Sequence, residues 1–286
     1  MRIRGSLIRG VGGVLFSLLL TLGLLEATLR LAPGLLGGSL ANAVYSAFRD
    51  WPLGMYVRDR VIKMNFMRPD FATRAYWNGY WWTHRTDAWG FRNPPDLERK
   101  SVVLLGDSMI YGLGVEEQDT VAHFLRAEHG RAAYSMARQG DGLFEEYVLA
   151  RLFLPRLSPE WVVLFVFLND FREAEANQQQ IERAASQLID GIDYPALLAR
   201  VEHPPDAIRL RDRVLSLRVA RLARGIVQMV GRDSAGADEG RQLTAAILED
   251  ARFAPLSAYY RTLLADLARR CRERRGELAL VLVEVP

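Results

Sequence analysis

The chain has 286 residues, half of them hydrophobic and a quarter charged, which is the composition of a folded protein with a sizeable core. Its 37 basic residues are interspersed with 34 acidic ones, and the net charge of +3 does not predict nucleic-acid binding. Cys271 is the single cysteine, which excludes an internal disulfide and a CxxC metal site. We expect Cys271 to be a half-buried helical residue, and we expect no metal or other cofactor.

An apolar segment near the N-terminus predicts a membrane anchor. Residues 11–25 carry no charge, and the stretch 7–31 is long enough to cross a hydrocarbon core of about 30 Å. Basic residues precede the segment, whereas none lies between Arg30 and Arg49; those that precede it are Arg2, Arg4 and Arg9. The positive-inside rule therefore predicts a single-pass protein of the inner (cell) membrane with its main domain in the periplasm.

A cleaved signal peptide is the alternative interpretation of this segment. Ala41-Asn42-Ala43 has the small-x-small pattern of a cleavage site, but it lies far beyond the apolar stretch. We therefore favour an uncleaved anchor over residues 1–32.

Residues 33–75 contain three prolines and predict an irregular connector. Four of the six tryptophans follow in residues 75–95. This aromatic cluster could form a substrate wall or touch the membrane surface, or it could pack as a lid over a sheet edge. We favour packing.

Strand and helix patterns then alternate over residues 76–286, which predicts one α/β domain. The expected strands are short apolar runs, buried on both faces, at 101–105, 132–137, 161–168 and 277–285. The expected helices are 120–130, capped by Asp119 and closed by Gly130, 143–155, ended by Pro155, and 256–276. Such strands separated by helices predict a parallel sheet covered on both faces.

Residues 171–255 are polar and predict a helical insertion, with apolar residues at helical spacing in 178–192 and 207–230. The second stretch is basic enough to touch an anionic membrane. An amphipathic helix that packs on its own domain is the interpretation we favour.

Polar residues follow three of the expected strands. Gly106-Asp107-Ser108 follows the first, Gly140 follows the second, and Asn169-Asp170 follows the third. Because the carboxyl ends of parallel strands meet at one edge of a sheet, these residues should lie close together. A serine hydroxyl can attack a carbonyl, and backbone N–H groups with an asparagine amide can stabilise the resulting oxyanion. The pattern is neither G-x-S-x-G nor a dinucleotide or P-loop fingerprint.

These blocks resemble those of the SGNH hydrolases, also called GDSL esterases/lipases, over roughly residues 84–170. The N-terminal anchor and the segment RTDAWGFR are similar to those of bacterial members. The resemblance implies a three-layer, flavodoxin-like fold with Ser108 as nucleophile. It also implies an oxyanion hole from the Ser108 and Gly140 N–H groups and the Asn169 amide, with Asp107 and Asp170 in support. Phe167 stands where the family's third block has glycine.

The family's catalytic base comes from a late D-x-x-H motif, which this sequence does not contain. Since a serine needs a base to accept its proton, the expectation is either a fragment that ends before this part of the fold, which we favour, or an inactive relative. Two classes of function stay open. One is a periplasmic ester hydrolase, or a related O-acetyltransferase, acting on an ester-bearing small molecule, lipid or polysaccharide. The other is a non-catalytic membrane-tethered module that binds a glycan or a partner.

Overall fold

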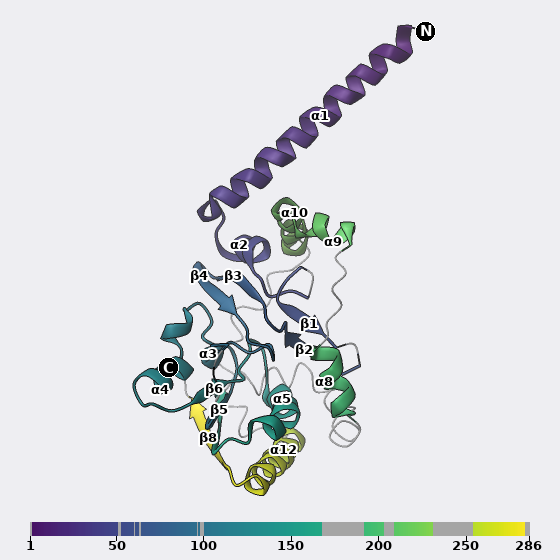
Figure 1. Ribbon diagram of the computed structural model, residues 1–286. Helices are drawn as coiled ribbons and strands as arrows, with labels where there is room; N and C mark the ends of the chain where they lie inside the picture. Colours follow the sequence, from purple (N-terminus) through teal and green to yellow (C-terminus); the bar gives the residue numbers. More distant parts are fainter. Residues whose placement is uncertain are drawn as a thin grey trace.

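The computed structural model describes residues 2–50, 53–59, 61–62, 64–95, 97, 100–167, 192–202, 209–230 and 254–283. Helix α1 (Arg2–Leu31) extends away from the rest of the molecule (Figure 1). Its stretch Val11–Leu31 has 21 residues and a mean hydropathy of 1.8, and within it Leu29, near the end, is buried. The chain thus has one N-terminal helix that is long and apolar enough to cross a membrane, as the sequence predicted.

A parallel four-stranded sheet forms the centre of the folded part, in the order β6-β5-β7-β8. The strands are β5 (Val102–Leu105), β6 (Ala133–Ser135), β7 (Trp161–Phe167) and β8 (Glu277–Val283). Helices α4 (Val121–Ala127), α5 (Leu143–Leu157) and α12 (Ala254–Glu273) flank it. The predicted mixed α/β class, a parallel sheet flanked by helices, is confirmed.

Strand β8 is not the fully buried strand that its apolar sequence predicted. It pairs only with β7 in the four-stranded sheet, and its residues alternate between half-buried and exposed. Leu280 is 51% exposed and Leu282 is 77% exposed. An edge strand has one hydrogen-bonding side without a neighbour, and the described residues leave part of one face of β8 uncovered.

The segment expected to be an irregular connector contains regular elements. They are the 3-10 helix η1 (Pro33–Leu35), helix α2 (Gly38–Tyr45) and the antiparallel strands β1 (Tyr56–Arg58) and β2 (Asn65–Met67). Met55 and Phe66 belong to the same hydrophobic core as the sheet. The prolines misled the prediction because Pro33 begins η1, a position at which proline is favourable. The division of the chain at residue 75 stays a prediction.

The tryptophan-rich segment forms a hairpin of β3 (Ala72–Trp77) and β4 (Tyr80–Arg85). Trp82 is 1% exposed and belongs to the main core. Trp81 packs on Tyr45 and Tyr76, with ring centroids 5.6 and 4.8 Å away. These tryptophans therefore pack inward, which agrees with the favoured interpretation.

The basic stretch 207–230 forms α9 (Leu210–Ser216) and α10 (Arg218–Val230), and α8 (Tyr194–Glu202) precedes it. Helix α10 contacts α2 and α1. A Cβ on Gly225 would lie 2.8 Å from the Cβ of Ala43, so glycine permits this close approach. Helix α10 thus packs on elements before residue 75, and whether these belong to the same domain stays a prediction. The helix expected at 178–192 lies outside the described residues except for Ile192, its last residue.

Two helix boundaries differ from the predictions. Thr120, not Asp119, caps α4, because its hydroxyl accepts the N–H of His123. Helix α5 continues through Pro155 to Leu157, so this proline lies in its last turn rather than after its end. Cys271 is fully buried on α12, where burial raises the pKa of its thiol to about 11.

Candidate active site

The turn after β5 presents Ser108 as the first residue of a short helix, α3 (Ser108–Tyr111). A Cβ on Gly106 would lie 2.7 Å from the Ile110 side chain, so this glycine lets α3 begin directly against the strand end. Asp107 caps α3, with its Oδ1 accepting the Met109 N–H at 2.9 Å. Ser108 itself is half-buried. As the first helical residue, it has no acceptor for its N–H within the helix.

The segment after β6 lies beside this turn. The N–H of Met136 donates to the carbonyl of Leu104 at 2.8 Å, and the N–H of Arg138 donates to the carbonyl of Gly106 at 3.2 Å. Gly140 follows two residues later, exposed, at φ +74° and with no atom within 4 Å of a Cβ built on it. The structure therefore brings the first two sequence blocks to one edge of the sheet. The role of the Gly140 N–H as an oxyanion donor stays a prediction.

A buried ion pair holds the Gly140 segment, and sequence reasoning missed it. Arg138 donates from Nε and Nη2 to the two carboxylate oxygens of Asp141 at 2.7 and 2.8 Å. The two side chains are 2% and 7% exposed. Arg138 also donates to the backbone carbonyl of Asn65 in β2. An arginine three residues before an aspartate in a glycine-rich loop was the available sequence signal.

Asn169 and Asp170 lie outside the described residues. Strand β7 is parallel to β5, with Leu105 opposite Leu164, and it is described to Phe167. Its carboxyl end consequently points to the same edge of the sheet as Ser108. The proposed amide donor and its neighbour stay predictions.

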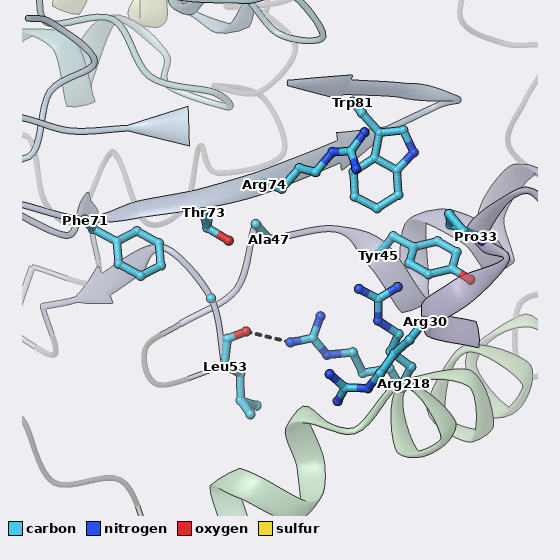
Figure 2. A pocket seen from close by; sticks show the side chains of 12 residues that line it. Arg30, Pro33, Tyr45, Ala47, Leu53, Phe71, Thr73, Arg74, Trp81 and Arg218 are labelled. Carbon is cyan, nitrogen blue, oxygen red and sulfur yellow. Dashed lines mark hydrogen bonds between the residues drawn. The ribbon is translucent and has the colours of Figure 1, made fainter. Parts of the chain in front are cut away.

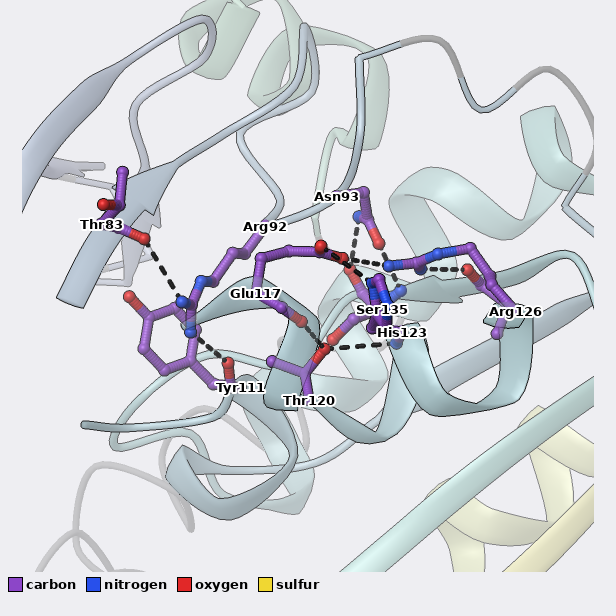
Figure 3. Close-up of polar contacts among 10 residues, drawn as sticks. Thr83, Arg92, Asn93, Tyr111, Glu117, Thr120, His123, Arg126 and Ser135 are labelled. Atoms are coloured by element: carbon purple, nitrogen blue, oxygen red, sulfur yellow. Dashed lines mark hydrogen bonds and ion pairs between the residues drawn. The ribbon is translucent and has the colours of Figure 1, made fainter. Parts of the chain in front are cut away.

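Arg92 fixes the loop that follows α3. Its guanidinium donates to the carbonyls of Gly112 at 2.8 Å and Val115 at 2.7 Å. It also donates, over longer distances, to the carbonyls of Tyr111 and Thr83, the two bonds drawn in Figure 3. Gly112 adopts φ +77°, and a Cβ there would lie 2.7 Å from Thr120 and 3.3 Å from Arg92. The loop after Ser108 is thus held by a buried cation whose partners are backbone carbonyls.

Asp87 in the RTDAWGFR segment, and Asn93 directly after it, attach the β3–β4 hairpin to the sheet. Asn93 exchanges two hydrogen bonds with the backbone of Ser135, at 2.8 and 2.9 Å, along the free edge of β6 (Figure 3). Asp87 accepts the hydroxyl of Tyr134 at 2.6 Å and the N–H groups of Trp89 and Phe91. Burial raises the pKa of Asp87, although these hydrogen bonds oppose the shift. In the described structure, this segment acts as a connector between layers.

Three of the four histidines have described positions. His84 is fully buried on β4, with its Nδ1 2.7 Å from the hydroxyl of Tyr111. Burial, assisted by the positive charge of Arg92, lowers the pKa of His84 to about 3, so its imidazole is neutral. His123 contacts Glu117 at 3.1 Å, and His129 lies beyond the end of α4. Within the described residues, no hydrogen bond joins any of them to Ser108, and His203 lies outside.

No group of three or more potential metal ligands occurs in the part of the chain that the structure describes. The expectation of no cofactor stays a prediction.

Neither the known protein-family models nor the curated proteins include a match to this chain. A solved structure entitled "Crystal Structure of TesA" aligns with 54% of this chain and 98% of its own chain. The aligned residues are 18% identical and the TM-score is 0.24.

Proposed function

We propose that the protein is a membrane-anchored serine ester hydrolase whose folded part lies outside the cytoplasm. Ser108 is the nucleophile, and its N–H, the Gly140 N–H and the Asn169 amide form the oxyanion hole. The substrate class is an acyl or acetyl ester on a small molecule, a lipid or a polysaccharide.

The observation that carries this proposal is the placement of Ser108. It stands at the carboxyl end of a central parallel strand, at the first position of a helix, with the Gly140 segment hydrogen-bonded alongside. Ligands of parallel α/β sheets bind at this edge. A tetrahedral intermediate formed on Ser108 needs N–H donors close to the nucleophile, and removing one such donor typically costs about 100- to 1000-fold in rate.

The chemistry requires a base that takes the Ser108 proton as the hydroxyl attacks the carbonyl carbon. A neutral His84 could accept a proton only at the ring nitrogen that carries no hydrogen. Its pKa of about 3 makes it a weak base. In our proposal the base therefore comes from elsewhere than His84.

A second candidate function is the non-catalytic, membrane-tethered binding module. The placement of the described histidines favours it, since none of them contacts Ser108 in the described structure. The hydrolase and this module differ in one measurable property, the reactivity of the Ser108 hydroxyl.

Labelling with a fluorophosphonate tests the proposal, because this reagent forms a covalent bond only with an activated serine. We expect the full chain in spheroplasts to be labelled by a membrane-impermeant fluorophosphonate, and Ser108→Ala to abolish the labelling. The impermeant reagent adds a test of topology: labelling that requires lysis would place the folded part in the cytoplasm.

Ser101→Ala is the matched control, because Ser101 lies at the other end of the same central strand. Its described hydrogen bonds use the backbone carbonyl, which accepts from Glu160 and Trp161. This variant should be labelled like the parent chain. An unlabelled parent chain, with a normal melting transition, would favour the binding module instead.

A further inference from the structure

A cavity of about 330 Å³ lies at the base of α1, and neither Ser108 nor Gly140 is among its lining residues. Residues from the end of α1, helix α2, the β3–β4 hairpin and α10 line it (Figure 2). Arg30, Tyr45, Trp81 and Arg218 are among the residues that line it. Four separate elements thus supply one concave surface.

The lining of this cavity is strongly positive. Four of its twelve residues are arginines, namely Arg30, Arg74, Arg218 and Arg221, and none is a carboxylate. Glu26 lies one turn before Arg30, and its carboxylate already accepts two hydrogen bonds. The donors are Arg30 at 2.8 Å and the N–H of Val219 at 3.0 Å. The cavity therefore gathers more positive charge than the neighbouring described carboxylate neutralises.

Arg218 and Arg221, unlike Arg30, are held by backbone carbonyls, which leave their charge uncompensated. Arg221 donates to the carbonyls of Leu53 at 2.9 Å and Val44 at 3.2 Å, and Arg218 donates to the carbonyl of Leu29 at 3.0 Å (Figure 2 shows the bond to Leu53). A carbonyl fixes a guanidinium in place, but it carries no negative charge.

Two of the guanidinium groups also lie over aromatic rings. Arg218 is 4.8 Å from the ring centroid of Tyr45, and Arg74 is 4.7 Å from that of Trp81. A guanidinium that stacks through its flat face keeps its N–H edge available for a ligand.

Arg221 shows the electrostatic cost of this arrangement. Its Nε is buried and has no hydrogen-bond partner in the described structure. Burial, and after it the charges of Arg49 and Arg218, lower the pKa of Arg221 to about 10. An anion in the cavity would relieve the repulsion among these cations and could accept hydrogen bonds from them.

The cavity also lies where a membrane surface would be. Arg30 is in the last turn of α1, at the end of the stretch that can cross a membrane. Tyrosine and tryptophan rings lie beside it, as is typical of membrane–water interfaces. Exposed apolar side chains on the adjacent helix α10 include Ile226 and Val227.

We propose that this arginine-lined cavity binds a phosphate ester, supplied by the headgroup of an anionic membrane phospholipid. Arginine is the side chain best suited to the task, since its fork of N–H donors matches two phosphate oxygens. The same chemistry would hold a water-soluble phosphate ester, and the two sources are separable by experiment. The site is independent of Ser108 and of the proposed hydrolase activity.

The test uses the full chain in detergent micelles, with bound lipid counted by native mass spectrometry. We expect retention of dioleoyl-phosphatidylglycerol but not of dioleoyl-phosphatidylcholine, and about tenfold weaker retention in Arg218→Gln and in Arg74→Gln. Arg74 is exposed on a hairpin strand, so its replacement should not disturb folding. In a second arm, glycerol phosphate competes with the lipid. Competition at concentrations similar to those of the lipid would identify a water-soluble phosphate ester as the ligand; its failure would identify the lipid.

Arg131→Gln is the matched control, because it removes the same charge from an exposed site just before β6. The basic residues ahead of the apolar stretch stay in every variant, so any lipid that they bind is a constant background. An equal fall in all three variants would mean a general charge effect and would overturn the proposal. Equal retention of the two lipids would do the same.

Discussion

Arg138 at the sheet edge and the arginines at the base of α1 are held in different ways. At the sheet edge, Arg138 is neutralised by two hydrogen bonds to one buried carboxylate, Asp141. At the base of α1, Arg218 and Arg221 are held by backbone carbonyls, and no carboxylate lines their cavity. The first arrangement fixes a loop, and because the charge of Arg138 is neutralised, this arginine does not attract an anion. The second keeps its positive charge, which is what a site for an anionic ligand requires.

The β3–β4 hairpin separates these two regions, and the alternation of β4 explains how. Successive side chains of a strand point to opposite faces. Trp82 and His84 point toward α3, where they contact the hydroxyl of Tyr111 at 3.4 and 2.7 Å. Trp81 points the other way and lines the arginine cavity. One six-residue strand therefore contributes to both regions.

The largest effect on stability is expected from removing the carboxylate charge that neutralises Arg138. Asp141→Asn removes the charge that compensates Arg138 and leaves a buried, unpaired guanidinium. Breaking a buried ion pair in this way costs about 3 kcal/mol or more. We expect that decrease in the free energy of unfolding, measured by urea denaturation of the full chain in detergent micelles.

Glu273→Gln is the control for an exposed ion pair. Glu273 bonds Arg269 at the end of α12, and the two side chains are 50% and 51% exposed. Its urea midpoint should stay within measurement error, because solvent screens such a pair. An equally small change in Asp141→Asn would show that Arg138 does not depend on its carboxylate, and the contrast with the arginines at the base of α1 would fail.

A pH-dependent effect of intermediate size on the free energy of unfolding is expected from His84 in the β3–β4 hairpin. Its pKa is about 3 in the folded protein against an ordinary value of 6.5, so the unfolded chain binds a proton that the folded chain excludes. Stability from this group is complete above pH 6.5 and is lost as the pH falls below it. Lowering the pH from 7 to 5 should cost about 2 kcal/mol from His84 alone.

The measurement compares urea unfolding at pH 7 and pH 5 for the parent chain, His84→Gln and His123→Gln. The glutamine at position 84 can still accept from Tyr111 but does not titrate. We expect a weaker pH dependence in His84→Gln than in the parent chain, and His123→Gln is the matched control because it replaces a half-buried histidine beside Glu117. If all three chains lose stability alike, the imidazole of His84 is not kept neutral by burial.

Local patterns were enough to predict most of the sheet from the sequence. The apolar runs ending at Leu105 and Phe167 and the weaker run at Ala133–Ser135 are strands. Such runs are informative because a strand buried on both faces needs apolar residues at every position. The exposure of β8 was not predictable from its own residues, since exposure depends on what covers a strand.

The candidate site, like the sheet, was predictable only where local sequence patterns determine the structure. The order of glycine, aspartate and serine after a strand predicts the turn at Ser108, and the parallel strands predict that the Gly140 segment lies beside it. The Arg138–Asp141 pair and the arginine cavity depend on side chains that meet in three dimensions. Arg30, Arg74 and Arg218 are far apart in the sequence, and no local pattern connects them.

A smaller stability effect than those at Asp141 and His84 is expected at Asp107, the residue next to the proposed nucleophile. Asp107→Ala removes the cap of α3 and should cost about 1 kcal/mol, whereas Asp107→Asn keeps an acceptor for the Met109 N–H and should cost less. Thr120→Ala, which removes the cap of α4, should cost a similar amount. Because asparagine keeps the cap but lacks the charge, Asp107→Asn should retain fluorophosphonate labelling of Ser108. Loss of labelling with unchanged stability would instead assign the carboxylate charge of Asp107 a direct part in activating Ser108. The sheet edge would then depend on a charged side chain, as the cavity at the base of α1 does.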